Sequence, residues 1–195
     1  MATDAEETVA PAGISLWLVP EGRDAERLSA LIDELAARHG TPRFAPHLTL
    51  LPLVGGAEDD VLKRAARLAR ELPPLEVRLV GPETRDEYFR RLLVRAEATP
   101  ALREAHARAA ARFGREADPT FLPHVSLLYG RLAAEEAERL RAALVSRVEG
   151  RFEAAHLHAW LTKGSVSDWR PLARFALGGA SPGGGGLVPT PRNHG

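Results

Sequence analysis

Two of the seven histidines, His47 and His124, occupy the same place in a repeated eight-residue pattern. Residues 44–51 read Phe-Ala-Pro-His-Leu-Thr-Leu-Leu, and residues 121–128 read Phe-Leu-Pro-His-Val-Ser-Leu-Leu. The unperturbed pKa of an imidazole is about 6.5, so near neutral pH one ring can be neutral while another is protonated. The pair therefore suits a reaction that needs a general base and a general acid in the same turnover.

A hydroxyl side chain follows each histidine at the second position, Thr49 in the first copy and Ser126 in the second. Each copy is typical of a short strand, because a proline precedes it where a missing N–H costs least and apolar residues follow. Side chains alternate faces along a strand, so each histidine shares a face with its hydroxyl. A sheet that buries the apolar residues between them turns both histidine and hydroxyl pairs to its other face.

A phosphodiester fits this set of groups. One imidazole would take a proton from an attacking water, and the other would give a proton to the leaving oxygen. The hydroxyls of Thr49 and Ser126 would donate hydrogen bonds to the nonbridging oxygens of the phosphate. The scheme needs neither a metal nor another cofactor.

The remaining elements must bring the two motif strands together. Residues 14–19 place Ile14, Leu16 and Leu18 on one face and Ser15, Trp17 and Val19 on the other, which is typical of a strand. Residues 24–38 carry apolar residues at helical spacing. A unit of helix, motif strand, helix and two strands occurs twice, which indicates an internal duplication around a pseudo-twofold axis. Besides the motif strands, we predict strands over 14–19, 75–80, 88–96, 152–162 and 169–177, and helices over 24–38, 58–71, 100–113 and 133–147.

Composition places these elements in one domain. Residues 1–13 are small, acidic and unpatterned, and Gly and Pro dominate residues 178–195. We therefore predict a single bilobal domain over 14–177 between a disordered N-terminal tail and a flexible C-terminal tail. We expect the protein to be a monomer.

Charge and hydropathy exclude several functions. The chain has 26 basic and 26 acidic residues, so no strong field draws it to a nucleic-acid backbone or an anionic membrane. It has no cysteine, which excludes disulfides and thiolate metal sites. No apolar run reaches the roughly 18 residues of a membrane span, and the acidic start lacks the features of a signal peptide. We expect a cytoplasmic protein that does not bind membranes.

The twin motifs resemble the His-x-Thr/Ser-x motifs of the two-histidine (2H) phosphoesterases. Within that superfamily, residues 15–20, the run after Ser126 that ends in Tyr129 and the turn over 162–169 are most similar to the cyclic phosphodiesterase branch of plants and yeast. The resemblance covers residues 14–177. It implies an α+β fold of two lobes, with antiparallel sheets and outer helices around a central cleft.

The resemblance also implies an activity and roles for the residues. The activity is metal-independent hydrolysis of a small cyclic nucleotide, either a nucleoside 2′,3′-cyclic phosphate opened to the 2′-phosphate or ADP-ribose 1″,2″-cyclic phosphate. It assigns His124 as the base and His47 as the acid, and Tyr129 as a lining residue of the phosphate site. Trp17 lies on the same strand face as Ser15 and is a candidate to stack on a base, with packing as the equal alternative.

Other interpretations remain open. One is an enzyme of the 2′,5′ RNA ligase type that acts on RNA ends, although Ser126 and the residues after it favour the cyclic phosphodiesterase. Another is a nucleotide- or RNA-binding module without turnover, which intact motifs in both copies disfavour. His156 and His158 have an i, i+2 spacing that metals sometimes use, but no partner ligand follows an obvious motif, so we predict no metal site.

Overall fold

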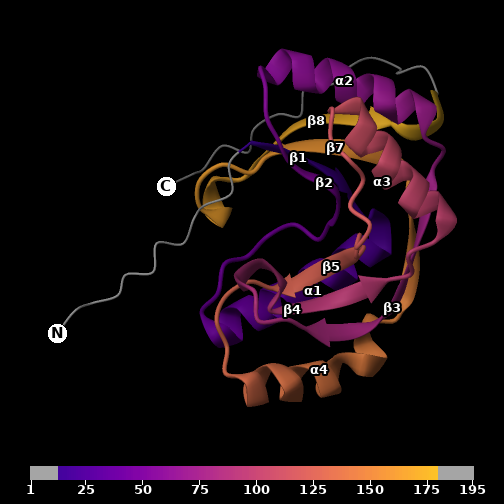
Figure 1. Ribbon diagram of the computed structural model, residues 1–195. Helices are drawn as coiled ribbons and strands as arrows, with labels where there is room; N and C mark the ends of the chain where they lie inside the picture. The colour runs from indigo at the N-terminus through magenta and orange to yellow at the C-terminus, as the bar shows by residue number, and fades with distance from the viewer. Residues whose placement is uncertain (1–12, 180–195) are drawn as a thin grey trace.

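The computed structural model describes residues 13–179, so the predicted tails lie outside the described residues except at Gly13 and at 178–179. The described chain forms one eight-stranded sheet in the order β6-β3-β4-β5-β2-β1-β7-β8, with four α-helices on its outer surface (Figure 1). None of these helices is long and apolar enough to cross a membrane. The helices are α1 (Gly22–His39), α2 (Glu58–Glu71), α3 (Pro100–Arg112) and α4 (Ala134–Val148). The strands are β1 (Ile14–Leu18), β2 (Leu48–Val54), β3 (Leu75–Thr84), β4 (Leu92–Ala96), β5 (His124–Leu128), β6 (Gly150–Ala154), β7 (His156–Leu161) and β8 (Arg170–Ala176).

The sheet consists of two four-stranded halves that meet at the motif strands β2 and β5. One half is β6-β3-β4-β5, which α1 and α4 cover, and the other is β2-β1-β7-β8, which α2 and α3 cover. The halves diverge from the seam so that the sheet curls, and the helices lie on its convex side (Figure 1). The face of the sheet that carries the histidines is therefore the concave one, between the two halves.

The seam lies on the pseudo-twofold axis. Across it Leu48 pairs antiparallel with Val125, and these two residues hold the same place in the repeated motif. Each motif strand also pairs with a strand that precedes it in the chain, β2 with β1 and β5 with β4. The repeated unit is therefore strand, helix, motif strand and helix, which starts one strand earlier than the unit predicted from the sequence.

The apolar positions of the motifs supply the core at the seam. Leu48 and Leu50 of β2, and Val125 and Leu127 of β5, are all 0% exposed. They contact the buried faces of the helices in one continuous hydrophobic cluster. Because side chains alternate along a strand, burying this set holds the histidine and hydroxyl set on the concave side.

Three local predictions were wrong in detail. The strand predicted over 75–80 continues through a bulge to Thr84, and Pro82 is tolerated there because pairing with β6 ends at Leu79. The start of the strand predicted over 88–96 is a 3₁₀ turn, Tyr88–Arg90, before β4. The strand predicted over 152–162 is interrupted at Ala155, so that β6 joins one half of the sheet and β7 the other.

Candidate active site

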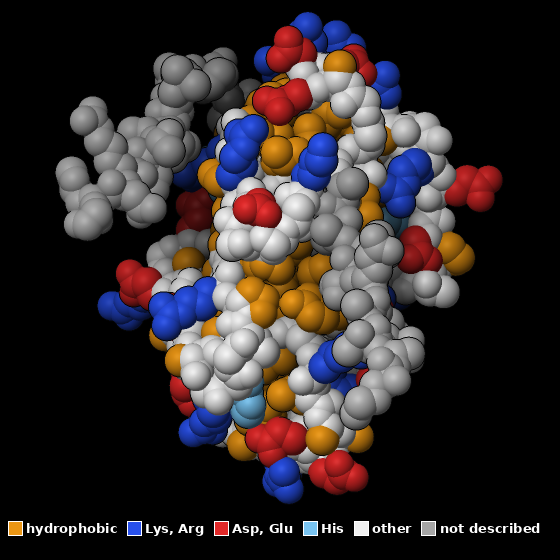
Figure 2. Space-filling model, turned by 90° about the vertical axis from the view of Figure 1, so that its left-hand side faces the viewer, with side chains coloured by type: hydrophobic (Ala, Val, Ile, Leu, Met, Phe, Trp, Pro, Cys, Tyr) orange, Lys and Arg blue, Asp and Glu red, His pale blue; other side chains and the backbone are white. Residues whose placement is uncertain are grey.

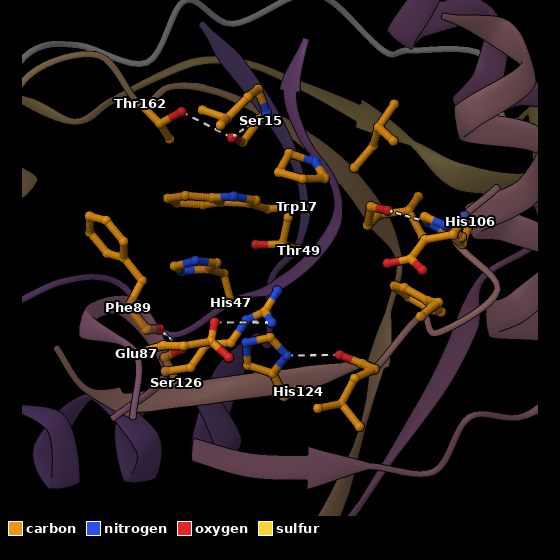
Figure 3. Close-up of a pocket in the computed structure, with 18 of the residues that line it drawn as sticks. Ser15, Trp17, His47, Thr49, Glu87, Phe89, His106, His124, Ser126 and Thr162 are labelled. Carbon is orange, nitrogen blue, oxygen red and sulfur yellow. Dashed lines mark hydrogen bonds and ion pairs between the residues drawn. The ribbon is translucent and has the colours of Figure 1, made fainter. Parts of the chain in front are cut away.

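A cavity of about 440 Å³ lies on the concave side of the sheet at the seam. On the face toward which the two halves diverge, hydrophobic side chains gather across the middle, with charged side chains above and below them (Figure 2). Figure 3 shows the cavity with His47 and Thr49 from one half of the sheet and His124 and Ser126 from the other. All six residues predicted for the site line it: Trp17, His47, Thr49, His124, Ser126 and Tyr129.

The two histidines are held in the same way. The Nδ1 atom of His47 lies 2.7 Å from the carbonyl oxygen of Ala45, and that of His124 lies 2.8 Å from the carbonyl oxygen of Leu122. A carbonyl only accepts, so each neutral ring carries its proton on Nδ1 and leaves the lone pair of Nε2 available. In both copies the chain just before the strand therefore fixes the tautomer that a general base needs.

Burial makes both rings hard to protonate in the ligand-free protein. Burial lowers the pKa of His47 from 6.5 to about 4, with a smaller effect from His124 and an opposing one from the hydrogen bond to Ala45. Burial also lowers the pKa of His124, where the carbonyl of Leu122 opposes the shift. Nearby charges act on His124 as well: Arg90 lowers its pKa further, whereas Glu87 raises it. Both imidazoles are thus neutral at neutral pH.

Trp17 covers one face of the His47 ring. The two rings stack with centroids 3.5 Å apart and 8° between their planes, and they lie one above the other in Figure 3. Trp160 stacks on Trp17 at 4.7 Å. Trp17 is only 2% exposed, and other rings contact it from His47, Trp160 and Trp169. Trp17 therefore has no open face for the base stacking considered from the sequence, and it holds the plane of His47 instead.

The two motif hydroxyls are not equivalent. Ser126 donates its hydroxyl to the carbonyl of Phe89 at 3.0 Å and also hydrogen-bonds to Tyr129. Thr49 lines the cavity from β2, half-buried. The Tyr129 hydroxyl lies 3.5 Å from Nε2 of His47, and burial raises the pKa of this phenol, so it keeps its proton. Thr49 is thus the motif hydroxyl placed to donate to a ligand.

Another wall of the cavity comes from residues that the sequence did not indicate. The segment between β3 and β4, expected to be a strand, places Glu87, Phe89 and Arg90 on the cavity. Trp169 lies 6.0 Å from Phe89 and 5.9 Å from Tyr129 between ring centroids. The only sequence signal for this aromatic wall is the turn over 162–169.

The remaining wall is polar and mixed in charge. It comes from the segment before β5 and from the bulged end of β2, where Arg115 donates to the carbonyl of Pro52 at 2.6 Å. Glu87 and Arg90 form an ion pair at 3.3 Å. The charged residues that line the cavity are Glu87, Arg90, Arg115, Glu116 and Asp118. The cavity lining thus carries three carboxylates and two guanidinium groups, with no excess of positive charge.

The histidine pair considered for metal binding lies outside this cavity. Nδ1 of His156 lies 2.8 Å from a carboxylate oxygen of Glu21, and a guanidinium nitrogen of Arg174 lies 3.1 Å from the same oxygen. Burial, together with Arg174, lowers the pKa of His158 to about 4. Over residues 13–179, no three histidine, cysteine or acidic side chains gather as metal ligands would.

Comparison with known proteins identifies the family and the fold. A family model described as the 2′-5′ RNA ligase superfamily matches residues 16–165. A protein of Arabidopsis thaliana named cyclic phosphodiesterase is 25% identical over 122 residues, which is 63% of this chain and 67% of that protein. Two solved structures share the fold. LigT of E. coli in apo form has a TM-score of 0.56 at 18% identity over 86% of this chain and 98% of LigT. TT0787 of Thermus thermophilus has a TM-score of 0.58 at 22% identity over 86% of this chain and 99% of that one. The predicted α+β fold of two lobes is confirmed.

Proposed function

Because the chain belongs to the 2′-5′ RNA ligase superfamily of two-histidine phosphoesterases, we propose that it is a metal-independent cyclic phosphodiesterase that hydrolyses nucleoside 2′,3′-cyclic phosphates. One observation carries the proposal. His47 and His124 line one cavity from either side of the seam between β2 and β5. Each ring donates its Nδ1–H to a backbone carbonyl. Two Nε2 atoms are thus left for two proton transfers around one phosphorus centre.

The reaction that fits is hydrolysis of one P–O bond. One imidazole takes a proton from water as its oxygen attacks phosphorus, and the other gives a proton to the ribose oxygen as that P–O bond breaks. For a 2′,3′-cyclic phosphate, breaking the bond to the 3′ oxygen yields the 2′-phosphate. Thr49 would donate a hydrogen bond to one of the remaining phosphoryl oxygens, which carry the developing charge, and Tyr129 would line the phosphate site.

The surroundings of the two histidines bear on which of them acts as the base and which as the acid. The family resemblance assigns His124 as the base and His47 as the acid. The pKa of about 4 for His47 favours the opposite order, since the acid must hold a proton before it gives one. Charges near His124 act in both directions, since Arg90 lowers its pKa and Glu87, with the smaller effect, raises it. We therefore propose His47 as the base and His124 as the acid, with the anionic substrate raising the pKa of His124 on binding.

Size and charge support a small substrate with one negative charge. A cavity of about 440 Å³ is in the usual range for sites that hold a small ligand. Glu116 and Asp118 would repel further phosphates near the cyclic one. Phe89 and Trp169 form an aromatic wall suited to a base. LigT has been crystallised with 3′-AMP, which accords with a nucleotide in this fold.

The decisive assay measures hydrolysis of 2′,3′-cyclic AMP by protein treated with EDTA. We expect wild-type turnover to survive the chelator, and His47→Ala and His124→Ala each to lose about 10²- to 10⁴-fold in kcat. His39→Ala in α1, which changes a half-buried histidine outside the cavity, is the matched control and should keep wild-type activity. Activity that both cavity variants retain, or that disappears with EDTA, would refute the proposal.

The order of acid and base has its own test. A substrate with an activated leaving group, such as a p-nitrophenyl phosphodiester, needs no proton on the departing oxygen. The variant that lacks the acid should recover most of its lost rate on that substrate, and the variant that lacks the base should not. We expect recovery in His124→Ala, and recovery in His47→Ala instead would restore the order implied by the resemblance.

A further inference from the structure

Both ring nitrogens of His106 form hydrogen bonds with backbone atoms beside the motifs. Its ring projects from α3 to the edge of the cavity and is 5% exposed (Figure 3). Nε2 accepts a hydrogen bond from the backbone N–H of Asp118 at 3.0 Å. The proton of the neutral ring is therefore on Nδ1, which donates to the carbonyl of Leu50 at 2.9 Å. Both nitrogens are engaged, so His106 offers no lone pair to a substrate.

One of these bonds holds the first motif strand. Within the described strands, β2 and β5 pair through Leu48 and Val125 alone, so the β2 backbone beyond that pair needs another partner. His106 supplies one at Leu50, the residue directly after Thr49. A side chain from a helix thus replaces the missing sheet hydrogen bond next to a residue of the site.

The other bond holds the turn that leads into the second motif. Asp118 accepts on its carbonyl from the backbone N–H of Phe121 at 3.1 Å, which closes the turn. The Phe121 ring lies flat on the imidazole of His106, with centroids 4.1 Å apart and 3° between the planes. The next residue, Leu122, provides the carbonyl that orients His124. The turn that positions His124 therefore rests on His106 through a hydrogen bond and a stacked ring.

We propose that His106 is a positioning residue for the proposed phosphodiesterase reaction, fixing the separation of the two motif segments and so of His47 and His124. The inference rests on the proposed function. Reacting groups must be held closely, because a misplacement of about 1 Å can cost about 100-fold in rate. A residue that only filled space in the core would need neither of the two hydrogen bonds.

Three substitutions separate the two bonds from packing. His106→Phe keeps a flat ring against Phe121 but leaves Leu50 and Asp118 without their partner. His106→Asn places an amide N–H where Nδ1 was and keeps the bond to Leu50, whereas His106→Gln places an amide oxygen near Asp118. We expect His106→Phe to lower kcat by about 10- to 100-fold with KM changed by less than about threefold, and the two amide variants to lie in between.

The control is Leu102→Ala in the same helix, which removes a fully buried side chain of the core. It should lower Tm at least as much as His106→Phe, yet keep wild-type kcat at a temperature where both variants are folded. Wild-type kcat in His106→Phe, or an equal loss of kcat in Leu102→Ala, would overturn the inference.

A second measurement is independent of turnover. Imidazole ¹⁵N NMR reports the hydrogen bond of His124 through its Nδ1 signal, and we expect this signal to shift in His106→Phe and not in Leu102→Ala. An unchanged His124 signal would overturn the inference even if the protein proved inactive on cyclic phosphates. Inactive wild-type protein with the predicted shift would refute the proposed function alone.

Discussion

The lowered pKa of His47 predicts how much the free energy of unfolding decreases in acid. Burial of the ring against Trp17 lowers that pKa from 6.5 to about 4. Between these two values the unfolded chain binds a proton on His47 and the folded protein does not. The free energy of unfolding must therefore fall as the pH decreases through this window, and the contribution is fully present only above about pH 6.5.

The magnitude follows from the same two values. At about 1.4 kcal/mol per pH unit, His47 alone should account for about 2.5 kcal/mol of the stability lost between pH 8 and pH 4.5. Other buried histidines and the carboxylates add losses of their own. The contribution of His47 is isolated by comparing wild type with His47→Asn, whose amide N–H can keep the bond to the carbonyl of Ala45 without titrating.

The assay is urea unfolding of both proteins at pH 8 and pH 4.5, followed by tryptophan fluorescence. Wild type should lose about 2.5 kcal/mol more than His47→Asn between the two pH values. NMR titration of the ring proton of His47 gives the pKa directly. Equal losses in the two proteins, or a His47 that titrates near 6.5 in the ligand-free protein, would refute this account of the buried ring.

Three further predictions follow from particular contacts. Trp17→Leu uncovers one face of His47, so NMR should show the pKa of His47 rising toward 6.5, and kcat should fall by about tenfold as the ring loses its support. Leu53 has φ of 53° at the bulged end of β2, so Leu53→Gly should raise the free energy of unfolding by about 0.5–1 kcal/mol in urea, whereas Leu53→Ala should not. Arg91 is 6% exposed and donates to the carbonyls of Arg85 and Leu132 at 3.0 and 2.6 Å, so Arg91→Met should cost about 3 kcal/mol in the same assay and displace Phe89. An unchanged midpoint for Arg91→Met would contradict the role of this buried arginine.

The motif strands and their two faces could be predicted because the information is local. The alternation that buries Leu48 and Val125 also determines that His47 and His124 lie on the opposite side of the sheet. The duplication added that the two copies meet at one place. Neither step requires knowledge of the distant chain.

The aromatic and charged walls depend on distant contacts and could not be predicted. Trp17 was predicted at the site, but its position between His47 and Trp160, a residue of β7 that is far away in sequence, was not. Phe89 belongs to a 3₁₀ turn, although its apolar and charged neighbours are also typical of a strand. Such local ambiguity is settled only by tertiary packing, here by buried Arg91 under the same segment.

The extended run over 152–162 shows a further limit. Its composition predicts a strand, and both β6 and β7 are strands. No local signal states that the first part pairs with β3 and the second with β1 and β8. The sequence thus predicts the extended backbone of this segment but not that the two halves of the sheet share it.

The most direct test is a crystal structure with the product 2′-AMP bound. We expect the phosphate between the two rings, with Nε2 of His47 and Nε2 of His124 each within hydrogen-bond distance of a phosphoryl or ribose oxygen, and the base against Phe89 and Trp169. A phosphate that contacts only one of the two imidazoles, or a nucleotide bound elsewhere on the protein, would contradict it.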